Sequence, residues 1–245
     1  MRFLPLLFLL PLLLACREPR LSPSAPLPDS IPPPPGTTAL DPDGIGKVYM
    51  GRQIARVMGH EGADWLERAG RDREEATDVL LRELRVRDTD IVADIGAGTG
   101  YFTFRLSPLV PNGRVKAVDI QPEMLRTLEK RAKALGLDNV DVVRGTEQAP
   151  GLAPNSITLA LLVDAYHEFA YPREMLIGLY KALRPGGRLA LVEFRAEDPT
   201  VAIKAVHKMS AAQCRRELTA VGFTFQEARP GLPRQHLLIF EKSAE

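Results

Sequence analysis

The stretch VADIGAGTG at residues 92–100 decides the fold, because it joins a short apolar run to an acid and to three glycines at every second position. An apolar run this short, followed by turn residues and a helical pattern, is typical of a buried parallel strand that enters a βα unit. Glycine has no Cβ and tolerates positive φ, so the backbone of this turn can approach a ligand closely. The helix expected from about Tyr101 offers that ligand free N–H groups and a positive dipole end.

A second acid follows the turn at an informative spacing. Residues 114–119 form another strand-like run, which ends at Asp119, 19 residues beyond Gly100. This distance accommodates about one helix and one strand, so adjacent parallel strands would bring the Asp119 carboxylate beside the glycine turn. There it can accept hydrogen bonds from both hydroxyls of a ribose.

The rest of the chain predicts a mostly parallel sheet. Further strands are expected at 140–143, 157–163 and 189–193, with helices from Pro122 to Leu135 and from Pro172 to about Leu183. Two last runs, 223–228 and 236–240, are joined by a Pro/Gly loop too short for a crossover helix, so they must be antiparallel. We predict a Rossmann-like α/β fold with seven strands, helices on both faces of the sheet and an antiparallel last strand.

The residues before the sheet, 41–90, are predicted to be helical. Apolar residues between Gly44 and Leu84 recur at helical spacing, interrupted at 59–62, which indicates two or three helices. The only tryptophan, Trp65, stands among charged residues. Two interpretations stay open: a solvated helix whose Trp packs on the sheet domain, or a lid over the glycine turn.

The first residues are typical of a targeting segment. Arg2 precedes an apolar run at 3–15 that is too short to span a bilayer as a helix, and the run ends at Ala15-Cys16. This resembles a bacterial lipoprotein signal, in which the cysteine is lipidated. An ordinary secretory signal, or a misassigned start upstream of Met50, is the alternative. Residues 16–40 are rich in Pro and Ser and are expected to form an extended tether.

Composition limits the possible partners. With 45% apolar and 26% charged residues, the 245-residue chain has the make-up of a globular protein. Removing Arg2 with the signal from the 32 Lys and Arg leaves 31 basic against 31 acidic residues. This balance gives no reason to expect a nucleic-acid partner.

Taken together, the motifs resemble those of class I S-adenosylmethionine-dependent methyltransferases over about residues 90–241. The resemblance rests on DIGAGTG at 94–100, VDI at 118–120, LRPGGRL at 183–189 and the closing hairpin. The longer stretch LRPGGRLALVEF is similar to quinone-biosynthesis C-methyltransferases. Nicotinamide-binding domains, by contrast, usually carry G-x-G-x-x-G and a sixth parallel strand. The methyltransferase domain is therefore expected at 91–245.

The resemblance implies a set of cofactor-binding residues. Gly96, Ala97, Gly98 and Gly100 would line the methionine and ribose, Asp119 would bind the ribose hydroxyls, and Ile120 would pack on adenine. Asp94 would order the glycine loop or receive the cofactor's ammonium through water, unless it only caps the next turn. Family members often have Gly-Asp after the third strand, where this chain has Gly145-Thr146-Glu147; Thr146 or Glu147 would substitute in the adenine contact.

Residues just past the fourth and fifth strands are expected to face the transferred methyl, because ligands lie outside the carboxyl ends of parallel strands. They are Asp164, also expected near the cofactor, Tyr166, His167, Glu168, Glu193, Arg195 and Glu197. His167 is a candidate general base, with Tyr166, Glu168 and Glu193 as further catalytic candidates. Arg195, Lys204, His207 or Lys208 could hold an anionic group. The alternative is that His167 caps a helix and Glu193 is a solvated strand end.

A metal site is not expected from the sequence, because the four histidines are scattered and no Cys/His cluster exists. The expected function is methyl transfer from S-adenosylmethionine to a small molecule by a monomer or homodimer, anchored to the membrane only through Cys16 on the periplasmic or cell-surface side. A cytoplasmic location follows if the signal is misassigned. A non-catalytic nucleoside-binding module and an NAD-dependent oxidoreductase are the alternatives.

Overall fold

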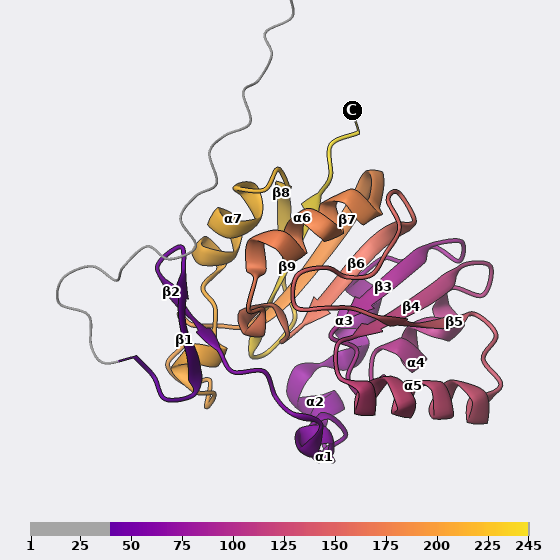
Figure 1. Ribbon diagram of the computed structural model, residues 1–245, viewed down its shortest axis with the longest axis horizontal. Coiled ribbons are helices and arrows are strands. Elements are labelled where there is room, and N and C mark those ends of the chain that lie inside the picture. Colours follow the sequence, from indigo (N-terminus) through magenta and orange to yellow (C-terminus); the bar gives the residue numbers. More distant parts are fainter. Residues whose placement is uncertain (1–39, 245) are drawn as a thin grey trace, which may run out of the picture.

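The computed structural model describes residues 40–244 (Figure 1). The expected signal peptide at 1–15, the lipidation site Cys16 and almost all of the tether at 16–40 lie outside these residues. Within the described part, no helix combines the length and the apolar character needed to cross a membrane.

A seven-stranded sheet forms the centre of the described chain, in the order β5-β4-β3-β6-β7-β9-β8. The strands are β3 (Ile91–Ile95), β4 (Arg114–Asp119), β5 (Val140–Arg144), β6 (Ile157–Val163), β7 (Leu183–Phe194), β8 (Thr224–Arg229) and β9 (Gln235–Glu241). β3 to β7 pair in parallel, whereas β9 is antiparallel to both of its neighbours. The predicted Rossmann-like sheet with its antiparallel last strand is confirmed.

The strand order reverses in the middle of the sheet. From β3 the chain proceeds outward through β4 and β5, and then returns to place β6 on the other side of β3. A ligand crevice forms where the connections leave a parallel sheet in opposite directions, at the carboxyl ends of the strands. The glycine turn after β3 and the residues after β6 therefore meet at this point.

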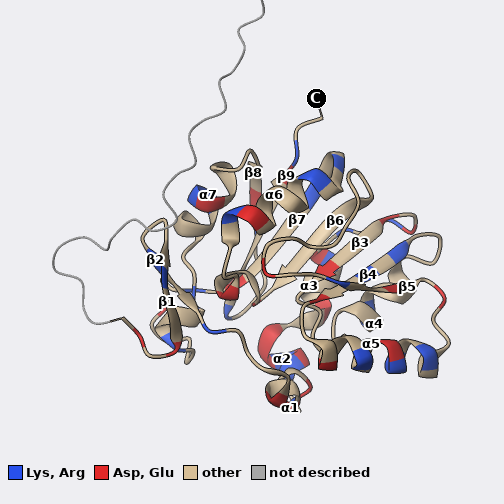
Figure 2. Ribbon diagram, in the orientation of Figure 1, with Lys and Arg blue, Asp and Glu red and all other residues tan. Residues whose placement is uncertain are grey.

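Helices cover both faces of the sheet (Figure 1). On one face, α6 (Pro172–Ala182) and α7 (Ala211–Thr219) bury Leu176, Leu179 and Leu218 against the strands. The opposite face is covered by α3 (Thr77–Glu83), α4 (Thr103–Leu106) and α5 (Pro122–Leu135). Figure 2 shows acidic and basic residues interspersed along α5, whose apolar residues face the sheet.

The helix ends follow the local sequence. Pro122 opens α5, where its missing N–H leaves no intrahelical bond unmade, and Gly136 ends the helix in the left-handed region. The side chain of Ser210 caps α7 by accepting a hydrogen bond from Gln213 N at 3.1 Å. The side chain of Gln213 does not return to the Ser210 backbone N–H, because its Nε2 donates to Met50 O and to Glu217.

The prediction of helix for residues 44–58 is wrong. This segment forms an antiparallel hairpin of β1 (Gly44–Tyr49) and β2 (Arg52–Ala55). Met50 and Gly51 both have positive φ, which is the geometry of a type I′ turn. The apolar residues of this segment are compatible with a helical period, but the two-residue turn at Met50 and Gly51 decides the local structure.

After the hairpin the prediction of helices is correct. A 3-10 turn at His60–Gly62 occupies the interruption, and α1 (Ala63–Leu66), α2 (Arg71–Glu75) and α3 follow. The fifth predicted strand is longer than expected, since β7 begins at Leu183 and includes the Arg184–Gly187 turn as an irregular start opposite Ile157.

Candidate functional site

The glycine turn after β3 is held against the end of β4. The N–H groups of Gly96 and Ala97 donate to Val118 O at 2.9 and 3.0 Å. Gly96, Gly98 and Gly100 all have positive φ. A Cβ on Gly96 would lie 2.9 Å from the Ala165 Cβ, and one on Gly98 would lie 2.7 Å from Leu66 Cδ1. The turn therefore needs glycine both for its conformation and for its close neighbours.

Asp119 lies beside this turn, as its spacing predicted. Its Oδ2 accepts a hydrogen bond from Gly98 N and its Oδ1 from Gln121 N, both at 2.9 Å. Burial raises the pKa of Asp119, and the backbone N–H groups of Gln121 and Gly98 oppose that rise. The carboxylate is thus fixed in place, and each oxygen keeps a lone pair for a further donor.

A cavity of about 720 Å³ opens over the turn and the carboxyl ends of β4 and β6. The candidate residues that line it are Gly96, Gly98, Asp119, Ile120, Thr146, Glu147, Asp164, His167 and Glu168. Ala97 and Asp94 instead line a neighbouring cavity of about 30 Å³, and Gly100 packs beside Phe104 and Leu128. The larger cavity has the volume of a site for a cofactor together with a small molecule.

Asp94 is buried below the turn and does not reach the larger cavity. Its Oδ2 accepts a hydrogen bond from Thr103 Oγ1 at 2.6 Å, which ties the end of β3 to the start of α4. Burial raises the pKa of Asp94 to about 6. The small cavity that it shares with Gly96 and Arg71 has room for a single water molecule.

Asp164 lies at the end of β6 with φ 48°, in the left-handed region. Gln235 Nε2 donates to its Oδ2 at 2.6 Å, but its Oδ1 is buried without a hydrogen-bond partner among the described residues. Burial and the nearby Glu193 raise the pKa of Asp164 well above its usual range. A buried carboxyl oxygen without a partner is an exception in folded proteins, and at Asp164 the raised pKa favours the protonated form.

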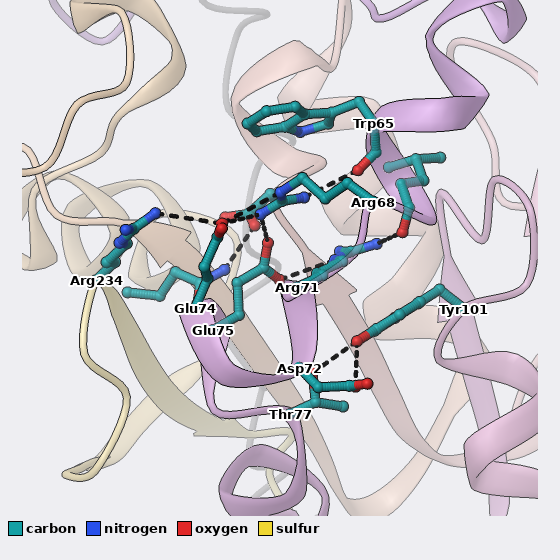
Figure 3. A network of polar contacts seen from close by, with 12 residues as sticks. Trp65, Arg68, Arg71, Asp72, Glu74, Glu75, Thr77, Tyr101 and Arg234 are labelled. Atoms are coloured by element: carbon teal, nitrogen blue, oxygen red, sulfur yellow. Dashed lines mark hydrogen bonds and ion pairs between the residues drawn. The ribbon is translucent and has the colours of Figure 1, made fainter.

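The segment before the sheet closes one side of the cavity, with Trp65, Leu66, Arg71 and Glu75 among its lining residues. Figure 3 shows the charged network that holds it: Arg68 donates to Glu74 and Glu75, and Arg71 Nε donates to Glu75 Oε2 at 3.0 Å. Trp65 stacks under Arg68 and is 49% exposed, so it is not packed into the sheet domain. The segment therefore forms one wall of the cavity, as the lid interpretation requires.

Arg71 is a residue that sequence reasoning missed. Its guanidinium is buried, lies 4.1 Å from the centre of the Tyr101 ring and donates to Leu66 O at 2.7 Å. It lines both cavities beside Gly96. Arg71 lies in a segment with several other charged residues, and only its burial distinguishes it from the other arginines. The sequence alone therefore does not identify it.

Two histidines and two acids cluster where β6 and β7 end. His167 Nδ1 lies 2.6 Å from Glu193 Oε2, and His167 Nε2 lies 3.1 Å from His207 Nδ1. Burial alone would lower the pKa of His167, but the charge and hydrogen bond of Glu193 outweigh it, so the pKa is raised. Burial raises the pKa of Glu168 to about 7, and burial lowers the pKa of His207.

His167, Glu168 and His207 all line the cavity. They also form a group of potential metal ligands whose donor atoms lie within 4.8 Å of one another. The sequence argument against a metal site counted scattered histidines and so missed this group. His167 and His207 are 40 positions apart, in two 3-10 turns without periodic patterning.

Two catalytic candidates do not line the cavity. Tyr166 is fully buried between the sheet and α7, where its hydroxyl donates to Glu217 Oε2 at 2.6 Å. Glu193 is also fully buried and reaches the cavity only through His167. Tyr166 is therefore not in a position to contact a substrate. Glu193 is not a solvated strand end.

The residues expected to hold an anionic group are dispersed. Arg195 donates to the backbone of Leu232 and Pro233. Glu197, which was expected to face the transferred methyl, pairs with His236 and does not line the cavity. Lys208 Nζ lies near the carbonyl oxygens of Asp198 and Val201. Of the candidate cations, Lys204 and His207 line the cavity.

Comparison with known proteins points to methyltransferases. Residues 93–189 match the family model of a methyltransferase domain. An uncharacterized methyltransferase-like protein of Schizosaccharomyces pombe is 33% identical over 155 residues, which cover 63% of this chain and 58% of that protein. A ubiquinone/menaquinone biosynthesis C-methyltransferase of Blochmanniella floridana is 29% identical over 117 residues, 47% of this chain and 46% of that protein. The chain spans about half the length of the curated relatives it matches.

Solved structures share the fold. An S-adenosylmethionine-dependent methyltransferase from Aquifex aeolicus is similar with a TM-score of 0.71 at 21% identity, covering 76% of this chain and 100% of that one. The cyclase SpnF is similar with a TM-score of 0.61 at 15% identity, covering 73% of this chain and 86% of its own. These likenesses show a common architecture, on which the site residues decide the chemistry.

Proposed function

We propose that this chain, which carries a methyltransferase domain of the class I S-adenosylmethionine-dependent fold, transfers the methyl group of that cofactor to a small molecule. The observation that carries the proposal is the cavity at the point where the strand order of the sheet reverses. The glycine turn and Asp119 line one part of it, and a cluster of titratable side chains lines another.

The cavity suits the nucleoside end of the cofactor. The Asp119 carboxylate, held by two backbone N–H groups, is positioned to accept hydrogen bonds from the ribose hydroxyls. Ile120 offers an apolar surface to adenine. Thr146 Oγ1 already accepts hydrogen bonds from Gln148 N and Ala149 N, so we assign the contact with the adenine amine to Glu147.

The methionyl end would lie toward the lid. Its carboxylate matches the buried guanidinium of Arg71, and its ammonium would lie beside Asp164, which lines the same cavity. Asp94 would contact the ammonium group through a water molecule in the small cavity that it shares with Arg71.

The remaining part of the cavity would hold the methyl acceptor. Bound S-adenosylmethionine supplies an electrophilic methyl group, and aligning the acceptor with that group accounts for most of the rate. Phe194, His167, Glu168 and His207 line this part and would orient the acceptor. Glu193 acts as a positioning residue, because it fixes the imidazole of His167 through Nδ1.

Methyl transfer is tested by incubating the purified protein with methyl-labelled S-adenosylmethionine and fractionated small-molecule extracts. We expect S-adenosylhomocysteine to form together with a labelled small molecule in at least one fraction. Cofactor binding without turnover in any fraction would favour the non-catalytic binding module instead. A Gly98→Val variant is the control, because its side chain would collide with Leu66 and block the turn.

A further inference from the structure

We propose that His167, Glu168 and His207 form a binding site for one divalent transition-metal ion, such as Zn²⁺, in the acceptor part of the cavity. The proposal extends the proposed function, but metal binding itself does not depend on methyl transfer. Two imidazole nitrogens and one carboxylate oxygen are a common ligand set for such ions.

The spacing of the three donor atoms fits a metal ion. His167 Nε2 lies 3.1 Å from His207 Nδ1, and Glu168 Oε1 lies 3.8 Å from each of these nitrogens. The centre of a triangle with these sides is about 2.1 Å from every corner, which is the length of Zn–N and Zn–O bonds. An ion at this centre lies in the plane of the three atoms, and the tetrahedral arrangement that zinc prefers forms when Glu168 Oε1 moves about 0.4 Å closer to the two nitrogens.

The imidazole of His167 is oriented for this role by Glu193, which contacts the ring nitrogen that faces away from the cluster. Glu193 Oε2 lies 2.6 Å from His167 Nδ1, and Glu193 Oε1 accepts a hydrogen bond from the backbone N–H of His167 at 3.3 Å. Metal-binding histidines usually donate their second ring N–H to a carboxylate in this way, which fixes the ring and makes the ligating nitrogen more basic. The buried carboxylate of Glu193 thus leaves His167 Nε2 as the nitrogen that points into the cluster.

The other two ligands are also held in place. Glu168 Oε1 accepts a hydrogen bond from Met58 N at 3.2 Å, and the Glu168 side chain is 15% exposed. His207 closes the cluster from its own 3-10 turn, with its ring 5.1 Å from the ring of His167 and nearly perpendicular to it. Imidazole ligands favour Zn²⁺ and its neighbours over Mg²⁺ and Ca²⁺, which prefer oxygen.

Three protein ligands leave one coordination position open, as in catalytic rather than structural zinc sites. All three ligands line the cavity, so this position faces the space assigned to the acceptor. If the proposed function holds, the acceptor would place a hydroxyl oxygen or another donor atom there, and the ion would orient it and lower its pKa.

The test is titration of the purified protein, freed of metal with a chelator, with Zn²⁺ in competition with a chromophoric chelator. We expect one Zn²⁺ per chain, an affinity that falls more than about 100-fold in His207→Ala, and a fall of about 10-fold or more in Glu193→Gln. His207 is partly exposed, so its truncation leaves a folded chain. His236→Ala is the matched control, because this histidine pairs with Glu197 outside the cavity and should leave the affinity unchanged.

S-Adenosylmethionine is titrated into the same preparations. Cofactor binding without stoichiometric Zn²⁺ binding, or an unchanged Zn²⁺ affinity in His207→Ala, overturns the metal site and leaves the proposed function in place. Zn²⁺ binding that depends on His207 in a protein without affinity for the cofactor would support the metal site and contradict the proposed function. With Co²⁺ as the probe, visible absorption of a nitrogen- and oxygen-ligated ion should appear in the parent and be lost in His207→Ala.

Discussion

Among single residues, Asp94 shows most clearly that an ionised group at the site lowers the stability of the fold. Its carboxyl is buried beneath the glycine turn and accepts only the Thr103 hydroxyl at 2.6 Å among the side chains around it. A buried acid whose only donors are the neutral groups of Thr103 is costly to ionise. A cationic group of a ligand, such as the proposed ammonium, would offset this cost by stabilising the ionised carboxylate.

Replacing Asp94 with Asn should stabilise the protein at neutral pH. Burial raises the pKa of Asp94 to about 6 from 3.8, so ionisation lowers the free energy of unfolding as the pH rises between about 4 and 6, and the loss persists at pH 7. Asp94→Asn removes this loss and should gain up to about 3 kcal/mol at pH 7, with the gain vanishing below about pH 4.

Urea denaturation at pH 4 and pH 7 measures this effect, with Asp138→Asn as the control at an acid that is not buried. The cofactor affinity of Asp94→Asn should fall at the same time. A variant that is less stable than the parent by the same amount at both pH values would contradict the assignment.

Some residues of the site are predictable from the sequence and others are not. Asp119 was found because a strand, a turn and a helix have nearly fixed lengths, so its distance from Gly100 placed it beside the turn. Arg71 and His207 lie in short elements that have no such rule, and their positions depend on how these elements pack. Tyr166 was misjudged because one residue along a 3-10 turn separates the core from the cavity.

At the scale of elements, the β1–β2 hairpin is the main departure from the sequence prediction. It contributes Asp43, Ile45, Arg56 and Met58, from its strands and flanks, to the cavity wall. Arg52 ties it to the domain through two hydrogen bonds to Glu217, at 2.7 and 3.1 Å. Long apolar strands such as β6 could be recognised from the sequence, whereas this short hairpin is defined by its turn and by one buried ion pair.

Breaking that ion pair should destabilise the whole domain. Glu217 is fully buried, so Arg52→Ala leaves its charge without the cation and should cost about 3–5 kcal/mol in the free energy of unfolding. The double variant Arg52→Met with Glu217→Gln should recover part of this loss, because the pair then leaves no unpaired buried charge and the amide oxygen can still accept from the buried Tyr166 hydroxyl.

Denaturant unfolding of the three proteins measures the difference, and Lys47→Ala, on the exposed side of the same hairpin, should change stability by no more than about 1 kcal/mol. A loss of less than about 1 kcal/mol in Arg52→Ala would show that the hairpin is not an integral part of the domain.

At the scale of the whole molecule, the cavity brings together segments that are far apart in the chain. The lid, the glycine turn and the ends of β4 and β6 all line it, together with the segment that carries Ile203 and His207. The parallel sheet makes this possible, since successive strands deliver their carboxyl ends to one edge (Figure 1). The fold was predictable because this alternation repeats, while the acceptor side depends on irregular segments without a motif.

The proposal that the domain is attached to a membrane rests on residues 1–16 of the sequence. Cys16→Ser should abolish incorporation of labelled fatty acid and release the protein from the membrane fraction of a bacterial host. Cys214 is buried and serves as the control position, because Cys214→Ser should leave labelling unchanged. Labelling that persists in Cys16→Ser would reject lipidation at this residue and support the cytoplasmic alternative or another secretory signal.

The most direct test of the central proposal is calorimetric titration of the purified protein with S-adenosylmethionine, beside an identical titration with NADH. We predict saturable binding of one S-adenosylmethionine per chain and no heat from NADH. Asp119→Ala should weaken the binding by about 1–3 kcal/mol, since the ribose hydroxyls lose a charged acceptor. Asp141→Ala, at an acid that pairs with Arg114 outside the cavity, should not. Heat from NADH alone, or an unchanged affinity in Asp119→Ala, would contradict the proposed cofactor site.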